Sequence, residues 1–423
     1  MTLVIIKEVL ANGLTLLTEA MPHVRSVAVG VWVKRGSRHE KQQQTGLSHF
    51  IEHMVFKGTK SRSAEVIASE VDSIGGHMDA FTAKEYAAFH LKVLDEHLPL
   101  AVELLGDIVM NPLFDRVEMA KEKKVIFEEI KMVEDTPDDL VMELFSQAFW
   151  PDHPLGRPIL GTRQSVGGFE RDEMAAFFRS VYHPGNVVIA AAGNLDHART
   201  SKLIGRHFGE LSIGKSARGN GHPPKSHAKI VTRSKRELEQ VHVCLGSPAF
   251  RQGHADRYGS YIMNTVLGGS MSSRLFQNVR EKRGLCYSIS SGVASYSDAG
   301  SLTIYAGTSL DTIDQVVRLT IEEIRRMKGE NVPAVELRRA KDHLKGSLML
   351  SLENTGSRMN YLARQEIYFG RQFGLDETLA GIEAVEAEDV RRIANAIFRG
   401  GLAMSVLGNL KGYRPRSTHL RLH

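Results

Sequence analysis

Residues 187–195 read VVIAAAGNL, an apolar run closed by Gly-Asn-Leu, and residues 402–410 repeat this plan as LAMSVLGNL. Each run follows a segment of helical spacing that begins on an acidic residue, at 170–181 and at 386–398. A short apolar run bounded by turn residues predicts a buried strand. Because the same unit recurs near the middle and near the end of the chain, the sequence predicts two copies of one domain.

The remainder of each half supports this repeat. Further matched segments, first half then second, are the strands 27–33 and 241–245, the glycine-ended helices 47–58 and 258–269, and the helix pairs 98–110 with 115–134 and 312–328 with 333–352. Strands such as 8–17 and 26–35 come in hairpin-like pairs, which favours antiparallel pairing. The expected fold class is α+β: two similar domains, each a mostly antiparallel sheet covered by helices on one face.

A polar, basic stretch rich in Gly and Pro at residues 212–228 is the expected linker. It divides the chain into an expected catalytic domain, 1–211, and a structurally similar second domain, 229–423.

Composition narrows the class of protein. The chain has 423 residues, 42% of them hydrophobic and 24% charged, which is typical of globular domains. No run approaches the roughly 20 apolar residues of a membrane span, and no signal-peptide plan begins the chain. We expect a cytoplasmic protein without a membrane partner, although the mature form of an exported one would look the same.

Two cysteines are too few for a disulfide framework or a Cys-based zinc site. The net charge of +5 without a clustered basic run does not favour nucleic-acid binding.

Chemistry is first indicated by HFIEH at residues 49–53. On a helix, residues i and i+4 share a face, so His49 and His53 point the same way. Two such imidazoles can bind one zinc ion, and Glu52 beside them can reach a water without being a ligand. This is the reverse of HExxH, the inverzincin pattern. A lone pair of histidines at this spacing is also common on surfaces and in cores.

A catalytic zinc needs a third protein ligand. The helix expected at 115–134 carries the pair Glu128-Glu129. Glu122 and Glu129 are two turns apart and share a face, so Glu129 could bind the metal while Glu122 orients a histidine or holds water. Taken alone, the same helix reads as an ordinary amphipathic helix with a solvated acidic face.

The two segments together resemble the pitrilysin/insulysin family of metallopeptidases, in particular its half-length bacterial members and the β subunit of the mitochondrial processing peptidase. Residues 46–59, GLSHFIEHMVFKGT, look like the active-site helix of that family. By this resemblance the third ligand is Glu129 rather than Glu128, and Glu122 is the acidic residue that supports catalysis. The second half lacks the HxxEH pattern, so one zinc per chain is expected.

The resemblance extends to both halves of the chain. Residues 75–82, GGHMDAFT, match the edge strand to which family members add a substrate peptide, and residues 155–162, LGRPILGT, match a segment without chemistry of its own. The expected substrate-binding residues are Gly76, His77, Met78, Asp79, Ala80 and Phe81. Asp79 departs from the common Asn of the family, which favours basic residues in the substrate. In the second half, residues 267–276 and 279–287 match a signature whose Arg280 and Tyr287 are expected to reach the active site.

The resemblance implies a zinc-dependent endopeptidase that hydrolyses short or unfolded peptides. A zinc-bound water would attack the scissile carbonyl, with Glu52 as general base and Tyr287 and Arg280 as donors to the oxyanion. A homodimer is expected, with a heterodimer of related chains as the alternative. Two rival interpretations are a non-catalytic scaffold subunit, which would usually have lost metal ligands, and a structural zinc module, which would usually have four protein ligands.

Overall fold

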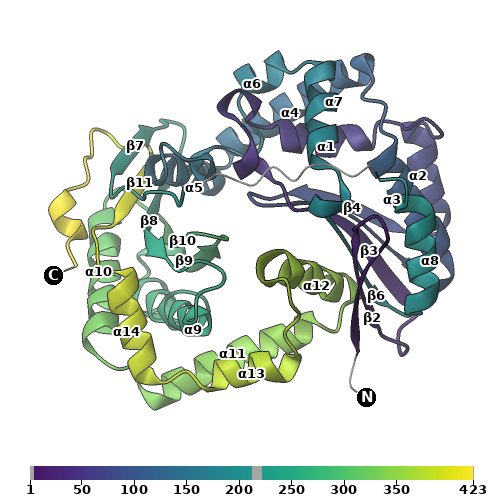
Figure 1. Cartoon of the computed structure of the whole chain (residues 1–423). Coiled ribbons are helices and arrows are strands. Elements are labelled where there is room, and N and C mark those ends of the chain that lie inside the picture. The colour runs from purple at the N-terminus through teal and green to yellow at the C-terminus, as the bar shows by residue number, and fades with distance from the viewer. Residues whose placement is uncertain (1–3, 212–221, 423) are drawn as a thin grey trace. The chain divides into compact units, whose positions relative to one another are not determined.

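A computed structural model describes residues 4–211 and 222–422 and contains two compact units. Unit 1 comprises Met1–Ile130, Pro158–Gly221 and Met349–Gln372, and unit 2 comprises Lys131–Arg157, His222–Leu348 and Phe373–His423. Each unit is built around one sheet and is described by itself (Figure 1).

Unit 1 contains a six-stranded sheet in the order β1-β2-β6-β3-β5-β4. Its strands are β1 (Ile5–Val9), β2 (Thr15–Ala20), β3 (Ser26–Val33), β4 (His77–Thr82), β5 (Ala87–Leu94) and β6 (Val187–Gly193). All neighbours are antiparallel except β2 and β6, which run parallel. The most apolar strand, β6, is fully buried at the centre of the sheet, and β4 lies at one edge.

One face of this sheet carries the larger core of unit 1, formed with helices from the first half of the chain. These helices are α1 (Leu47–Val55), α2 (Ala64–Ser73), α3 (Leu98–Met110), α4 (Arg116–Asp135), α7 (Arg171–Val181) and α8 (His197–Phe208), and a short α6 (Arg163–Gly168) precedes α7. Met119 and Ile126 bring α4 into the core beside Phe50 and Met54 of α1. The two helices that carry the motif residues are therefore fixed against the same sheet.

The opposite face is also covered, which corrects the expectation of helices on one face only. Helix α12 (Thr355–Phe369), from the second half of the chain, packs Met359 and Leu362 against Trp32 of β3 and Val188 of β6 (Figure 1). The physical reason is that β3 and β6 are apolar on both sides. A strand with two apolar faces needs cover on both.

Unit 2 contains a five-stranded sheet in the order β7-β11-β8-β10-β9. Its strands are β7 (Ile230–Ser234), β8 (Val241–Ala249), β9 (Cys286–Ser295), β10 (Gly300–Thr308) and β11 (Ala403–Gly408). One face packs with α9 (Arg257–Leu267), α10 (Ile313–Gly329), α11 (Ala334–Ser351), α13 (Leu375–Glu383) and α14 (Ala387–Ile397). Helix α5 (Pro137–Phe149), from the first half, covers the other face, where Ser405 Oγ donates to Val141 O at 2.8 Å.

The repeat predicted from the sequence is confirmed by strand order. Strands β2, β6, β3, β5 and β4 of unit 1 follow the same sequence of neighbours as β7, β11, β8, β10 and β9 of unit 2, with the parallel pair at the same place. The pairing expected between residues 8–17 and 26–35 is wrong, because β6 lies between β2 and β3. The fully apolar β6 takes the central position, where both of its faces are buried.

The two units exchange segments relative to the division expected from the sequence. Helix α5 belongs to unit 2 although it lies within residues 1–211, and α12 belongs to unit 1 although it lies within 229–423. Most of the expected linker, residues 212–221, lies outside the described residues.

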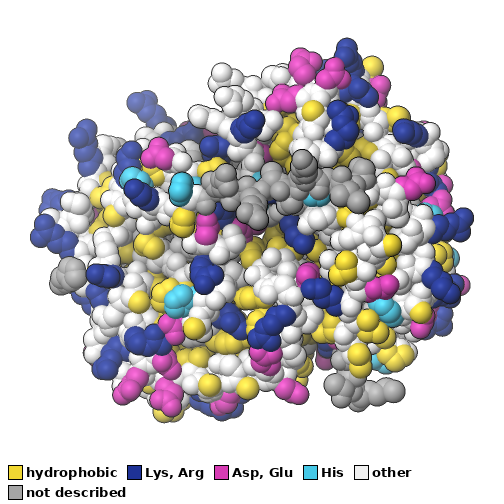
Figure 2. Space-filling view, viewed as in Figure 1, with side chains coloured by type: hydrophobic (Ala, Val, Ile, Leu, Met, Phe, Trp, Pro, Cys, Tyr) yellow, Lys and Arg dark blue, Asp and Glu magenta, His cyan; other side chains and the backbone are white. Residues whose placement is uncertain are grey.

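Among residues 4–211 and 222–422, no helix is both long and apolar enough to cross a bilayer. On the face drawn in Figure 2, Lys and Arg side chains are scattered among acidic and uncharged ones.

Candidate metal centre

The start of helix α1 is fixed by a close backbone approach. Gly46, which precedes α1, has a φ of 97°, and a Cβ there would lie 2.7 Å from the Cα of Gly161. Gly161 also has a positive φ of 78°. Residues other than glycine rarely adopt this left-handed backbone conformation, and a side chain would not fit in the contact between Gly46 and Gly161. The segment 155–162, for which the sequence gave no chemistry, therefore supports the helix that carries the motif.

A buried carboxylate also holds this helix end. Glu40 accepts hydrogen bonds from the backbone N–H groups of Gly46 at 2.9 Å and Ser48 at 2.7 Å. Acidic groups at a helix N-terminus satisfy unpaired N–H groups and interact favourably with the helix dipole. Burial nevertheless raises the pKa of Glu40 to about 7. Glu40 thus links the loop before α1 to the turn that contains His49.

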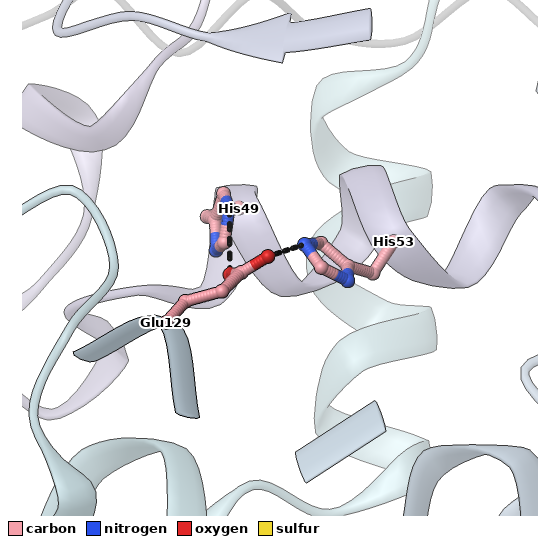
Figure 3. A group of neighbouring side chains, drawn as sticks. All are labelled: His49, His53 and Glu129. Carbon is pink, nitrogen blue, oxygen red and sulfur yellow. Dashed lines mark ion pairs between the residues drawn. The ribbon is translucent and has the colours of Figure 1, made fainter. Parts of the chain in front are cut away.

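His49, His53 and Glu129 come together at one point (Figure 3). The two histidine rings lie on successive turns of α1, with centroids 4.7 Å apart. Glu129 reaches them from α4: Oε2 lies 3.7 Å from His49 Nε2, and Oε1 lies 3.5 Å from His53 Nε2. The helical spacing of the motif and the choice of Glu129 over Glu128 thus correspond to an actual convergence of side chains.

These atoms lie close enough together to bind one zinc ion. Ligands bound tetrahedrally at about 2.1 Å lie roughly 3.4 Å from one another, and the ligand atoms of the three residues all lie within 4.8 Å of one another. Glu129 Oε2 is buried and has no hydrogen-bond partner among the described residues, as expected of an atom that awaits a cation. Within the described part of the chain, this is the one group of three or more His, Cys, Asp or Glu side chains whose ligand atoms converge in this way. The donor set fits zinc.

His53 is oriented by a second carboxylate. Its Nδ1 lies 3.0 Å from Oε2 of Glu122, which is buried on α4 two turns before Glu129. Oε1 of Glu122 in turn pairs with Lys57 Nζ at 2.8 Å. A carboxylate on Nδ1 selects the tautomer whose Nε2 carries a free lone pair. That lone pair faces Glu129, where the metal would lie.

His49 is in a different environment from His53. It is 8% exposed, and its Nδ1 has no hydrogen-bond partner among the described residues. Burial, with a smaller contribution from the neighbouring His53, lowers the pKa of His49 to about 3. The ring is therefore neutral at physiological pH, and a neutral imidazole is the form that binds a metal.

Glu52 lies beside the three converging side chains. Its Oε2 accepts a hydrogen bond of 2.5 Å from Oγ1 of Thr82, the last residue of the edge strand β4. Burial raises the pKa of Glu52, while the Thr82 hydrogen bond acts in the opposite direction. A carboxylate whose pKa moves toward neutrality becomes a stronger base at physiological pH.

A pocket of about 460 Å³ opens beside Glu52 and His53. Its other lining residues are Phe56, Lys57, Ala64, Ile67, Ala68, Met78, Asp79, Ala80 and Glu122. Strand β4 therefore borders this pocket, and its outer edge has no strand neighbour among the described residues. The Asp79 side chain is 58% exposed and lies 3.9 Å from Nε2 of His90. The stretch expected to bind substrate thus lies at an open sheet edge next to the converging ligands.

Arg280 and Tyr287 belong to unit 2 and contact each other. Arg280 Nε donates to the backbone oxygen of Tyr287 at 2.7 Å, and the guanidinium lies 4.6 Å from the ring centroid of Phe276. The Tyr287 side chain is 78% exposed. These contacts place the pair together, and their approach to the metal ligands in unit 1 stays a prediction.

Sequence reasoning missed three supporting residues, Glu40, Lys57 and Thr82. Lys57 and Thr82 lie within the stretches 46–59 and 75–82, but nothing in their spacing shows which carboxylate each one contacts. Glu40 lies nine residues before His49, outside any helical spacing, and only the folded loop brings it to the helix end. An acidic residue shortly before an expected helix is the one signal that could have indicated it.

Comparison with known proteins identifies the family of the chain. Residues 15–163 match the family model described as "Insulinase (Peptidase family M16)", and residues 168–344 match "Peptidase M16 inactive domain". The "Uncharacterized zinc protease YmxG" of Bacillus subtilis is 43% identical over 396 residues, covering 94% of this chain and 96% of the relative. The chain belongs to peptidase family M16. The sequence resemblance to the pitrilysin/insulysin family is therefore confirmed.

Another curated relative and two solved structures match this M16 peptidase along nearly its whole length. An uncharacterized zinc protease of Streptomyces coelicolor is 38% identical over 416 residues, covering 97% of this chain and 91% of the relative. The crystal structure of a protease from Helicobacter pylori has a TM-score of 0.88 at 20% identity and covers 96% of this chain and 100% of that one. An M16 inactive-domain structure from Pseudomonas fluorescens also has a TM-score of 0.88 at 20% identity, covering 97% of this chain and all of that one. These two structures show that the fold is shared along nearly the whole chain.

Proposed function

We propose that the chain hydrolyses short or unfolded peptides with one zinc ion held by His49, His53 and Glu129. The chain is a zinc metallopeptidase: it belongs to family M16, and its full-length relatives are named zinc proteases. The observation that carries the residue assignment is the convergence of His49, His53 and a carboxylate oxygen of Glu129 that has no hydrogen-bond partner among the described residues, with Glu52 adjacent.

Zinc bound at this point supplies a Lewis acid that polarises the scissile carbonyl and lowers the pKa of a water molecule. Glu52 is the general base: its carboxylate takes a proton from the attacking water and later delivers it to the leaving amine. Glu122 supports the site by holding His53. Arg280 and Tyr287 are proposed as donors to the oxyanion, on the strength of the family resemblance alone.

The peptide is proposed to bind as an extra strand along β4. An unpaired strand edge offers a row of backbone N–H and C=O groups that can pair with an extended segment. Residues 76–81 provide that edge, and the pocket beside Glu52 receives a substrate side chain. A segment already paired in a folded protein cannot join this edge, so unfolded or short peptides are the expected substrates.

Neither rival interpretation accounts for the site. A non-catalytic scaffold subunit does not require three metal ligands next to a carboxylate, Glu52, whose pKa is raised. A structural zinc module would be closed by a fourth protein ligand, whereas the group found among the described residues has three members and adjoins a pocket.

Assembly is proposed from the family resemblance. A chain of this length corresponds to half of the longer family members, so we propose a homodimer, with a heterodimer of related chains as the alternative. Sedimentation of the purified chain distinguishes a dimer from a monomer.

The proposal is tested with Glu52→Gln, which keeps the shape of the side chain and removes the base. Cleavage of an internally quenched peptide library should be lost while zinc content stays at one per chain. Glu128→Gln, an exposed position on α4, is the matched control and should cleave normally. Normal turnover by Glu52→Gln would overturn the role of Glu52, and zinc loss in that variant would reassign it as a ligand.

A further inference from the structure

The edge strand β4 and the helix α1 are joined by one side-chain hydrogen bond. Thr82 is the last residue of β4 and pairs with Ala87 of β5. Its Oγ1 lies 2.5 Å from Oε2 of Glu52 and 3.5 Å from the backbone oxygen of Ser48. Met78 and Ala80, which alternate with Thr82 along the strand, pack against the core on the same side as α1. The hydroxyl therefore points from the substrate edge toward the base.

The two carboxylate oxygens of Glu52 differ in their hydrogen bonds. Oε2 accepts the Thr82 hydrogen bond, whereas Oε1 accepts none from the described residues. Both the helix and the strand are otherwise fixed, since α1 is held at its N-terminus by Glu40 and β4 is paired along its whole length with β5. A glutamate side chain has several rotatable bonds, so one hydrogen bond to a rigid strand restricts how its carboxylate turns.

We propose that Thr82 is the positioning residue for Glu52: its hydroxyl holds Oε2 so that Oε1 faces the water to be deprotonated. The inference rests on the proposed function of Glu52 as general base. Thr82 keeps its own proton throughout, because Glu52 Oε1 receives the proton from the water and passes it to the leaving amine. No bond to Thr82 forms or breaks.

A second consequence follows from the place of Thr82 in the sheet. The strand that would pair with the peptide backbone is the same strand that holds the base. The strand that would hold the scissile bond therefore also positions the Glu52 carboxylate. Their relative position does not depend on the loop 83–86 or on α2. Positioning of this kind lowers the barrier of the chemical step without adding affinity for the substrate.

The hydroxyl is removed by Thr82→Val, which keeps a β-branched side chain of nearly the same shape and suits a strand. Measured on one internally quenched decapeptide chosen from the library, kcat should fall about 10- to 100-fold while KM changes less than about twofold. Zinc content and the thermal midpoint should match the wild type. Thr82→Ser, which restores the hydroxyl, should recover most of the lost kcat.

The matched control is Thr15→Val, the same substitution on β2 of the same sheet, four strands away from β4. It should leave kcat and KM unchanged. A kcat of Thr82→Val within twofold of the wild type would overturn the inference, and so would a Thr82→Ser variant as impaired as Thr82→Val. A loss confined to KM would also overturn it, because it would assign the hydroxyl to peptide binding.

Failure of this inference is distinguishable from failure of the proposed function. If Glu52→Gln is inactive and Thr82→Val is normal, Glu52 remains the base and only the positioning role is lost. If Glu52→Gln is active, the base itself is misassigned, and the Thr82 inference falls with it.

Discussion

The Nδ1 atom of His53 lies 3.0 Å from Oε2 of Glu122, and the other ring nitrogen of His53 faces Glu129. The carboxylate thus fixes both the tautomer and the direction of the ring. Lys57 holds the second oxygen of Glu122 at 2.8 Å, which keeps this buried carboxylate directed at His53. Zinc binding at the proposed site would accordingly depend on a residue that does not itself touch the metal.

Glu122→Ala should lower the affinity for zinc about 10- to 100-fold, because His53 loses the partner that orients it. Competition against a fluorescent zinc chelator measures this directly. Glu118→Ala is the matched control: Glu118 lies one turn earlier on α4, where its carboxylate pairs with the exposed Lys121. Equal zinc affinities in the two variants would show that Glu122 has no part in the site.

The third ligand is tested by a neighbouring pair of glutamates. Glu129→Gln should lose most of its zinc under dialysis that leaves the wild type loaded, whereas Glu128→Gln should keep it, because the structure directs Glu129 toward the histidines. Zinc should also raise the thermal midpoint of the wild type and of Glu128→Gln but not that of Glu129→Gln. The opposite ranking of the two variants would move the ligand to Glu128.

The repeat and the pair of motif histidines could be predicted because their signals are local, whereas Glu129 was chosen over Glu128 only through the family resemblance. The Gly-Asn-Leu strand ends, the helix 47–58 and the spacing of His49 and His53 are each set by a single segment or by a match between segments. Helical periodicity placed the two histidines on one face, and the structure brings their rings to 4.7 Å.

What the sequence did not reveal depends on contacts between distant segments. Nothing in the sequence indicated which sheet residues 355–369 cover, so the exchange of α12 and α5 was missed. The pairing of 8–17 with 26–35 failed for the same reason, since β6 comes from residues 187–193. Likewise, the capping of α1 by Glu40 requires a folded loop, which has no repeating pattern to read.

Glu40 predicts a specific dependence of stability on pH. Its folded-state pKa, about 7, lies above the ordinary value of 4.5, so the folded chain holds this proton more tightly than the unfolded chain. The resulting stability is fully present below about pH 4.5 and is lost as the pH rises through about 7. A difference of this size corresponds to roughly 3 kcal/mol.

Glu40→Gln, which does not titrate, should lack this decline. Urea unfolding at intervals from pH 4.5 to 8 should show the wild type losing stability relative to the variant as the pH rises. Glu65→Gln, at an exposed position in the first turn of α2, controls for the loss of one carboxylate. Curves for wild type and Glu40→Gln that stay parallel over this range would contradict the assignment.

The exchange of α12 is tested through the ion pair that joins this helix to β2. Arg358 Nη1 lies 2.5 Å from Oε1 of Glu19, and the two side chains are 15% and 2% exposed. Arg358→Met should lower the free energy of unfolding by about 3–5 kcal/mol, because it leaves a buried carboxylate without its cation. The double variant with Glu19→Gln should recover much of that loss, since no charge then remains buried.

Arg364→Met, at an exposed position on the same helix, should cost little. Urea unfolding of the wild type, the single variants Arg358→Met and Glu19→Gln, and the double variant closes a double-mutant cycle. A cost for Arg358→Met no larger than that for Arg364→Met would mean that α12 is not held on this sheet.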